Sequence, residues 1–231
     1  MSASERLNEL MRITASYDIV SFDVFDTLLV RQVPNPQDVF EILEAVANAE
    51  GILISNLQRL RIEAEKKAEL LFTTPTLDEI YDLLGKETNI NEEQLNRLKL
   101  IEIQVEKDLL LPRKDVKELF NSLLQKGKRV ILISDMYLSS SVIKELLSSS
   151  GFDISNYEIY VSCEERKTKA SGKLWAYLTN KIKTNTWLHL GDDTIGDVRY
   201  PRKYGIQVLP ETFKIKSPKT LFIENEILNN I

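Results

Sequence analysis

After Pro112 the sequence alternates regularly between strand and helix patterns, and this alternation leaves few folds open. Helix patterns are predicted over 114–125, 140–149 and 171–181, with a short helix before the last strand. The apolar stretches between and around them predict strands over 129–133, 158–161, 187–190 and 206–209. An earlier apolar run, Tyr17–Phe22, predicts one further strand. Strands that alternate with helices form a parallel, doubly wound sheet. We therefore expect an α/β, Rossmann-like three-layer core that binds its ligand at the carboxyl edge of the sheet.

Between Pro34 and Leu111 the pattern is wholly helical. One helix is expected from Asn35-Pro36 to Gly51, and a second over 55–71. Capping-box patterns, Thr76 with Glu79 and Asn91 with Gln94, open two more helices. Helices that follow one another with no strand between them predict an inserted helical bundle. The chain then divides into a core domain, residues 1–30 and 112–231, and an inserted α-helical domain, residues 31–111.

The two ends of the chain carry weaker patterns. Ser4–Thr14 predicts an amphipathic helix ahead of the first strand. The segment after Pro210 predicts either a final helix over 217–230 or a linker.

Composition narrows the partners and the compartment. The 35 acidic residues outnumber the 30 Lys and Arg residues, and a net charge of −5 gives no reason to expect a nucleic-acid or anionic-membrane partner. No apolar run approaches the ~20 residues of a transmembrane helix, and the N-terminus lacks the apolar region of a signal peptide. The single cysteine, Cys163, cannot form an internal disulfide, and we expect a buried strand residue rather than a nucleophile there. These features predict a cytoplasmic protein.

Polar side chains follow the predicted strands, at the ends that meet at one edge of a parallel sheet. They are Asp23, Asp26 and Thr27 after the first strand, Ser134 and Asp135 after the second, Lys167 and Lys169 after the third, and Asp192, Asp193 and Asp197 after the fourth. Carboxylates brought together in this way repel, by about 4 kcal/mol for two charges 4 Å apart at an effective dielectric of 20. A hard divalent cation removes that repulsion, and Mg²⁺ prefers oxygen ligands.

In order and spacing these residues resemble the four motifs of the haloacid dehalogenase-like (HAD) superfamily. The motifs correspond to an apolar strand ending in Asp-x-x-x-Thr at 22–28, a strand ending in Ser134, a lysine ahead of a helix, and Gly-Asp-x-x-x-x-Asp at 191–197. The helical insert resembles the α-helical (C1-type) cap of this superfamily. Residues 21–29 and 133–138 are further similar to HAD domains found with bacterial glycosyltransferases and surface-polysaccharide genes, which implies a fused or partner glycosyltransferase.

The resemblance implies catalytic roles for four residues. Asp23 is the implied nucleophile, which forms an aspartyl-phosphate. Ser134 is expected to hydrogen-bond a phosphoryl oxygen. Lys169 offsets charge on the nucleophile and the phosphoryl group; it is preferred to Lys167 because it lies six residues before Trp175. Asp26 is a candidate for the residue that transfers a proton to the leaving group.

The same resemblance implies a magnesium site. Asp23 and Asp192 are expected to ligate Mg²⁺, with Asp193 or Asp197 helping directly or through water, and the backbone carbonyl of Phe25 is a further expected ligand.

Thr27, Ser134, Asp135 and Arg31 are expected to contact the substrate. For Arg31, an ion pair with a carboxylate of the cap is an equal alternative. For Asp135, the equal alternative is the N-cap of a helix. The only histidine, His189, is expected to support the site or the core rather than to act as a base.

One position departs from the family pattern. Most phosphatases of this family carry a second Asp two residues after the nucleophile, where this chain has Phe25, and Asp26 follows one residue later. Three interpretations stay open: a phosphatase whose proton is handled by Asp26, a cap residue or solvent; a hydrolase of a phosphonate or carbon–halogen bond; and a catalytically weak module that binds a phosphorylated sugar or a partner enzyme. For Asp26 itself a turn or cap-hinge role is the alternative. The favoured prediction is a magnesium-dependent phosphohydrolase acting on a small phosphorylated metabolite, a sugar or polyol phosphate in first place.

Overall fold

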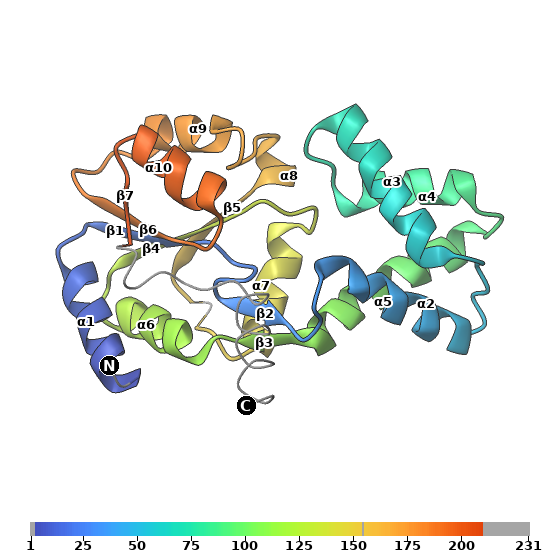
Figure 1. The fold of residues 1–231 in the computed structure, drawn as a ribbon, viewed down its shortest axis with the longest axis horizontal. Coiled ribbons are helices and arrows are strands. Elements are labelled where there is room, and N and C mark those ends of the chain that lie inside the picture. Colours follow the sequence, from blue (N-terminus) through green and yellow to red (C-terminus); the bar gives the residue numbers. More distant parts are fainter. Residues whose placement is uncertain (1–2, 154, 210–231) are drawn as a thin grey trace, which may run out of the picture.

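The computed structural model describes residues 3–153 and 155–209, and it confirms the predicted α/β architecture (Figure 1). A five-stranded parallel sheet has the order β5-β4-β1-β6-β7. The strands are β1 (Ile19–Phe22), β4 (Arg129–Ser134), β5 (Tyr157–Val161), β6 (Trp187–Leu190) and β7 (Gln207–Val208). The alternative of a helix or a linker over 217–230 lies outside the described residues.

Buried side chains cover both faces of the sheet. Successive residues of a strand point to opposite sides, so each strand contributes to both layers. In β1, Val20 and Phe22 belong to one buried cluster, and Ile19 belongs to the other. Helices α1 (Ala3–Ala15), α6 (Lys114–Gln125) and α7 (Ser140–Ser149) contribute to the first cluster, and α9 (Lys173–Lys181) contributes to the second. Figure 1 shows α9 with α10 (Tyr200–Lys203) on one side of the sheet and α1 with α6 on the other. This arrangement is the expected three-layer core.

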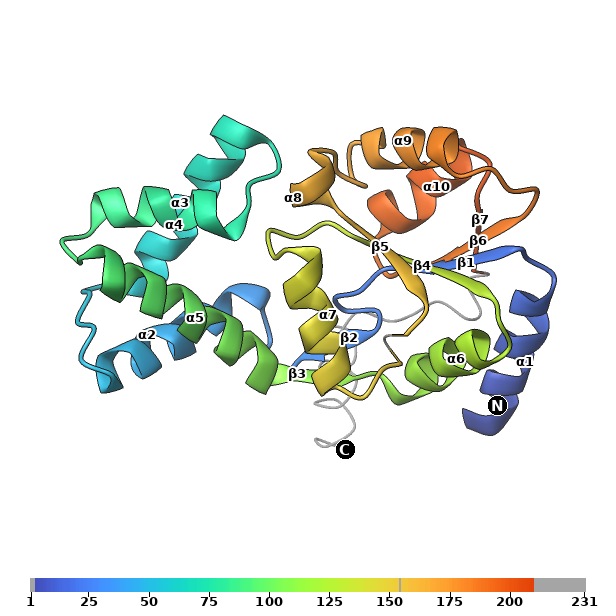
Figure 2. The same cartoon turned by 180° about the vertical axis from the view of Figure 1, so that it is seen from behind.

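The inserted helices, called the cap from here on, form a body beside the core (Figure 2). They are α2 (Val39–Ala49), α3 (Leu57–Phe72), α4 (Leu77–Glu87) and α5 (Glu92–Leu109), preceded by a short 3₁₀ turn, η1 (Pro36–Asp38). Both predicted capping boxes are present, at Thr76 with Glu79 and at Asn91 with Gln94. The cap begins and ends on an antiparallel ribbon of β2 (Leu29–Arg31) and β3 (Leu110–Pro112). The predicted domain boundaries fall in this ribbon.

The ribbon and one short helix were not predicted. Three-residue strands are too short to show an alternating pattern, so the sequence gives no signal for β2 and β3. Helix α8 (Ser162–Glu165) follows β5 in a segment for which no helix was predicted. Cys163 is buried as expected, but it lies in α8 rather than in a strand. Among the described residues, none of the helices combines the length and the apolarity needed to cross a bilayer.

The cap also contacts the core at a second place, away from the ribbon. The backbone N–H of Leu77 donates to the carbonyl oxygen of Tyr137, at 2.9 Å. Arg166 of the core donates to both carboxylate oxygens of Glu79, at 2.9 Å each, and to the carbonyl oxygen of Thr74. The Tyr137 ring lies 4.9 Å from the guanidinium of Arg61 inside the cap. The loop after β4 therefore reaches into the cap and fixes it over the carboxyl edge of the sheet.

Candidate active site

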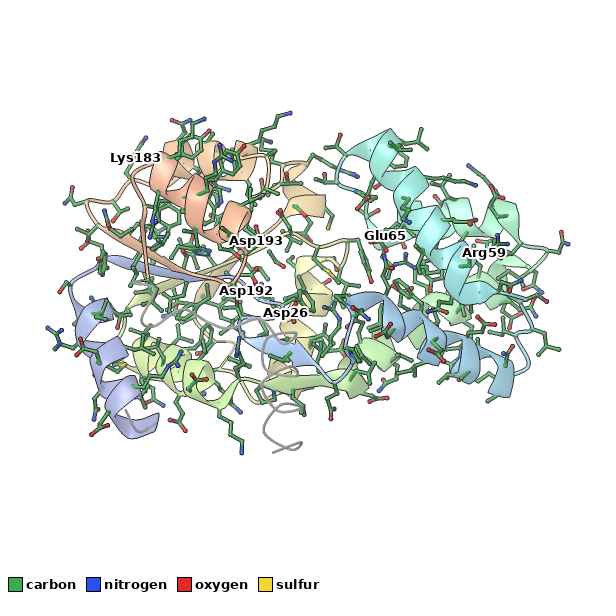
Figure 3. The ribbon with its side chains drawn as sticks, in the orientation of Figure 1. Asp26, Arg59, Glu65, Lys183, Asp192 and Asp193 are labelled. Atoms are coloured by element: carbon green, nitrogen blue, oxygen red, sulfur yellow. The ribbon has the colours of Figure 1, made fainter. Side chains whose placement is uncertain are left out.

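Four side chains from three separate segments meet at the carboxyl edge of the sheet. Lys169 Nζ lies 2.5 Å from Asp23 Oδ1 and 2.7 Å from Asp197 Oδ1. Asp23, Asp192 and Asp197 each offer a carboxylate oxygen within 4.8 Å of the others. Asp23 follows β1, Lys169 lies in the loop before α9, and the other two follow β6. Figure 3 shows Asp192 and Asp26 at this edge, on the side of the core that faces the cap.

The loop after β6 brings Asp197 back against the end of its own strand. The side chain of Asp193 accepts the backbone N–H groups of Ile195 and Gly196, which starts a single π-helical turn, η2 (Thr194–Arg199). That turn returns Asp197 toward Gly191, where a Cβ atom on the glycine would lie 2.4 Å from Asp197 Cγ. Only glycine permits this approach, so Gly191 is needed for the position of the buried carboxylate.

A chain of buried hydrogen bonds holds Asp197 from beneath. Trp187 Nε1 donates to Ser21 Oγ at 2.7 Å, Ser21 Oγ lies 2.8 Å from His189 Nδ1, and His189 Nε2 lies 3.0 Å from Asp197 Oδ1. Because the tryptophan can only donate and the carboxylate can only accept, the Ser21 hydroxyl donates to Nδ1 and the histidine carries its proton on Nε2. Burial lowers the pKa of His189, which keeps the ring neutral. His189 therefore supports the site, as the sequence predicted.

The electrostatics of the site show an excess of negative charge. Burial raises the pKa of Asp23 well above its usual value, although Lys169 opposes the shift. Burial, reinforced by Asp26 and Asp197, raises the pKa of Asp192 to about 6. For Asp197, Lys169 and His189 outweigh burial and hold its pKa below the usual range. The positive charge of Lys169 thus offsets the negative charge of Asp197 but only part of the charge of Asp23 and Asp192.

The residues present fit a divalent metal ion. Three carboxylates with oxygens this close are a hard-oxygen ligand set of the kind that Mg²⁺ takes. The raised pKa of Asp192 comes from burial and from the neighbouring acids Asp26 and Asp197, and a bound cation would favour its charged form. Asp23, Asp192 and Asp197 would hold the metal.

A cavity of about 590 Å³ lies above these groups, between the core and the cap. Its size is within the usual range for a small-molecule site. The predicted site residues that line it are Asp23, Phe25, Asp26, Arg31, Ser134, Asp135, Lys169, Asp192, Asp193 and Asp197. Nearly all of the predicted site thus opens into one cavity.

Thr27 differs from its predicted substrate contact, whereas Asp193 and Arg31 were each predicted with an alternative. Among the described residues, Thr27 does not line the cavity; it is fully buried, and its hydroxyl donates to Asp192 at 3.4 Å, so it supports a ligand instead of touching the substrate. The Asp193 carboxylate lies outside the group of three because it caps η2. Arg31 makes the alternative contact, an ion pair with Glu106 of the cap at 2.9 Å.

Asp135 also has a different partner from the one weighed as an alternative. It does not cap α7, which is capped by Ser139. Its carboxylate accepts the backbone N–H groups of Lys169 and Ala170, at 2.8 and 3.2 Å. Asp135 therefore ties the loop after β4 to the loop that carries Lys169.

The first loop is irregular at the position where the family pattern is broken. Asp26 has a φ of 60°, in the left-handed region, and its backbone carbonyl accepts from Arg113 at 2.7 Å. A regular loop would turn Asp26 away from Asp23, but here Asp26 lines the cavity and raises the pKa of Asp192. The ring of Phe25 lies 4.6 Å from the Arg31 guanidinium. The structure gives no test of the Phe25 carbonyl as a ligand, which stays a prediction.

Sequence reasoning missed Ser21 and Arg113. Ser21 lies on a buried strand, and a serine inside an apolar run was its one signal. Arg113 directly follows Pro112 and belongs to no motif that would have indicated its contact with the first loop.

Comparison with solved structures identifies the fold. The HAD-hydrolase YfnB from Bacillus subtilis, solved bound to magnesium, is similar with a TM-score of 0.52 and 20% identity, over 92% of this chain and 99% of that one. A haloacid dehalogenase-like family hydrolase from Xanthomonas campestris gives 0.52 and 16%, over 82% and 79%. L-2-haloacid dehalogenase from Xanthobacter autotrophicus gives 0.53 and 14%, over 85% and 80%. No protein-family model matches the sequence, and the search of curated proteins finds no match. The chain has the fold of the HAD-like hydrolases, as its motifs led us to expect.

Proposed function

We propose that this chain is a magnesium-dependent phosphohydrolase that works through an aspartyl-phosphate on Asp23. The observation that carries the proposal is the contact of Asp23 with Lys169, beside two further carboxylates whose oxygens lie within 4.8 Å. A carboxylate held next to an ammonium group, at the floor of a cavity of metabolite size, is arranged for attack on an electrophile brought by the substrate.

The residues of the chain divide the reaction between them. An oxygen of Asp23 attacks phosphorus, a new P–O bond forms to the carboxylate, and the ester P–O bond to the leaving alcohol breaks. The leaving oxygen takes a proton, and water then hydrolyses the aspartyl-phosphate and restores Asp23. Lys169 stays positive throughout, because Asp197 and Asp23 outweigh burial and raise its pKa. The lysine therefore offsets the negative charge that gathers on the phosphoryl group.

Mg²⁺, held by Asp23, Asp192 and Asp197, would neutralise phosphoryl oxygens when bound. Ser134, nearly fully buried at the end of β4, lines the same cavity and would donate a hydrogen bond to the phosphoryl group.

The proton for the leaving group has three candidate sources: Asp26, a residue of the cap, and solvent. Asp26 lines the cavity, and burial raises its pKa, so the carboxyl form is favoured more than in water. This supports the interpretation in which a phosphatase manages without an acid at position 25.

One observation favours a second candidate function, the cleavage of a bond that needs no acid on the leaving group. The side chain at the usual acid position is the Phe25 ring, which lines the cavity under Arg31. A phosphonate hydrolase would keep the metal site and accept this change. Carbon–halogen cleavage is less well supported, because the three close carboxylates provide for a metal. Weak catalysis by a binding module is the remaining alternative.

For the substrate we propose a small phosphorylated metabolite, with a sugar or polyol phosphate favoured. The cavity of about 590 Å³ between the core and the cap supports a substrate of this size. We also propose a cytoplasmic location, supported by the single buried Cys163, and a fused or partner glycosyltransferase, supported by the motif likeness alone. Neither a nucleic acid nor a membrane is proposed as a partner.

A metabolite panel assayed for phosphate release, with and without Mg²⁺, tests the proposal. Release from at least one phosphate ester that depends on Mg²⁺ and on Asp23 supports it. Phosphate release from a phosphonate only would favour the second candidate, and binding of phosphorylated sugars without any release would favour the binding module.

A further inference from the structure

The charges around the cavity are strongly unbalanced. Nine carboxylates line it against two cations, Arg31 and Lys169. Both cations are engaged, Lys169 by Asp23 and Asp197, and Arg31 by Glu106. A metal ion and a phosphoryl group bound together would change the balance at the core side only. The cap side would keep its own negative charge.

That charge comes from two residues of α3, one helical turn apart. Glu65 and Glu69 both line the cavity, and α3 places no basic side chain there. Figure 3 shows Glu65 on the side of the cap that faces the core. Like charges at positions i and i+4 repel each other on a helix, and this pair persists on the face that closes over the site.

The two glutamates are unequal. Glu65 forms an ion pair with Arg61 at 2.7 Å, and Arg61 is itself fully buried and bound to Glu102. Within residues 3–153 and 155–209, no side chain forms an ion pair with Glu69. Glu65 is therefore held in place by the interior of the cap, whereas Glu69 is exposed at the cavity and has no ion-pair partner among the described residues, although the charge of Lys66 also acts on it.

A third side chain of the same wall also lacks a partner. Thr74 lines the cavity and is 4% exposed, and its hydroxyl has no hydrogen-bond partner among the described residues. A buried hydroxyl without a partner is costly unless a ligand supplies one. The cap wall thus offers an unpaired carboxylate and an unsatisfied hydroxyl, both of which suit a donor on the ligand.

We propose that the leaving group of the substrate carries an ammonium group, bound at the cap wall by Glu65 and Glu69, with Thr74 taking a neighbouring polar group. The substrate class is a phosphate monoester of an amino sugar or an amino alcohol. This inference rests on the proposed phosphohydrolase function and goes further by naming the charge of the leaving group. Leaving groups that carry a carboxylate or a second phosphate are disfavoured by the same wall.

Matched substrate pairs test the proposal, since each pair differs in one amino group. Glucosamine 6-phosphate is compared with glucose 6-phosphate, and ethanolamine phosphate with 2-hydroxyethyl phosphate, as kcat/KM with Mg²⁺. The ammonium member of at least one pair is expected to be favoured roughly tenfold, the effect of ~1.4 kcal/mol. The pair that shows the preference tells amino sugars from amino alcohols.

Two variants of α3 locate the effect. Glu69→Gln removes the unpaired charge and is expected to bring the ratio within a pair close to one. Glu63→Gln is the control, because Glu63 lies on the same helix, is paired with Arg59 and does not line the cavity. The control is expected to keep the ratio of the unmodified protein. A ratio that falls equally in both variants would overturn the assignment to the cap wall.

Equilibrium binding to the Asp23→Asn variant separates this inference from the proposed function. Calorimetric titration with each substrate pair in the presence of Mg²⁺ is expected to show the same preference for the ammonium member. Turnover without any such preference, in rate or in binding, overturns the inference and leaves the phosphohydrolase intact. Absent turnover with the binding preference retained overturns the phosphohydrolase and leaves the ammonium site.

Discussion

The core site and the interior of the cap both bury ion pairs, but they balance charge differently. In the cap, Arg61 is fully buried, bonds Glu102 through two nitrogens and Glu65 through a third, and lies 4.5 Å from the ring of Phe40. In the core, one buried cation, Lys169, serves two carboxylates, and Asp192 stands beside them. Arg61 also serves two carboxylates, but Glu65 is 29% exposed and keeps contact with solvent, whereas the core adds a third close carboxylate, Asp192, to its single cation.

This difference separates a structural network from a functional one. A buried charge network in which each member has its partners rigidifies the protein and needs no ligand. A buried network with surplus charge of one sign is costly unless a ligand or metal completes it or some of its acids take up protons. The excess at the core is therefore the sign of a site, and the balance in the cap is the sign of a scaffold.

The largest effect is expected where the core network does chemistry. Asp23→Asn removes the nucleophile and keeps the shape of the side chain, so turnover is expected to fall about 10⁴- to 10⁶-fold. Steady-state kinetics measures the loss, and circular dichroism checks that the fold is kept. Ordinary activity in this variant would exclude the covalent mechanism.

Disruption of the cap network is expected to lower the stability of the protein rather than its catalytic rate. Arg61→Met leaves Glu102 buried without its cation, and such a loss costs about 3–5 kcal/mol of unfolding free energy. Urea denaturation measures the change. Arg59→Met, on an exposed residue of the same helix, is the control and is expected to stay within about 0.5 kcal/mol.

A double variant sharpens the same point. Replacing Arg61 and Glu102 together by apolar residues removes both charges, and the stability is expected to recover most of the loss. If the double variant were as unstable as Arg61→Met, the network would be acting through packing and not through charge balance.

Restoring the family pattern in the first loop is expected to have a smaller effect, a gain in catalytic rate. Phe25→Asp places an acid at the usual position, and general acid catalysis is worth about 10²–10⁴-fold, so a gain of at least about tenfold is expected on alkyl phosphates. Para-nitrophenyl phosphate, whose leaving group needs no acid, is the control and is expected to gain less. Equal loss on both substrates would show that the Phe25 ring has its own role under Arg31.

The smallest predicted effect is the pH dependence of metal binding. Burial raises the pKa of Asp192 to about 6, so at lower pH the carboxyl group holds a proton that must leave before it can ligate a cation. The affinity for Mg²⁺ is therefore expected to fall by about tenfold between pH 7 and pH 5. Calorimetric titration at both pH values measures it, and an affinity that rises toward low pH would contradict the assignment.

The sequence predicted the order of the main elements and the meeting of distant acids, because both follow from short-range patterns. Lys114–Gln125 and Ser140–Ser149 form helices where the sequence predicted them, since apolar spacing and a following glycine mark these helices. The place of Asp23, Lys169 and Asp192 followed from parallel topology, which puts strand ends together.

What the sequence did not predict depends on contacts across the chain. The partner of Asp135 is a backbone 34 residues away, and the alternative of a local helix cap failed because Ser139 takes that place. The inward turn of Asp26 needs a left-handed φ, which a regular loop does not suggest. The acidic wall of α3 was invisible because Glu65 and Glu69 look like ordinary solvated positions until the cap is folded over the core.

Binding of Mg²⁺ is the measurement that decides whether the surplus acids form a site. Calorimetric titration near pH 7.5 is expected to show one bound ion for the unmodified protein. Loss of a residue that only orients a metal ligand typically weakens metal binding about 10- to 100-fold. Asp192→Asn removes an expected ligand itself, so at least that loss is expected. Absence of binding in the unmodified protein, or equal binding in the variant, would contradict the account.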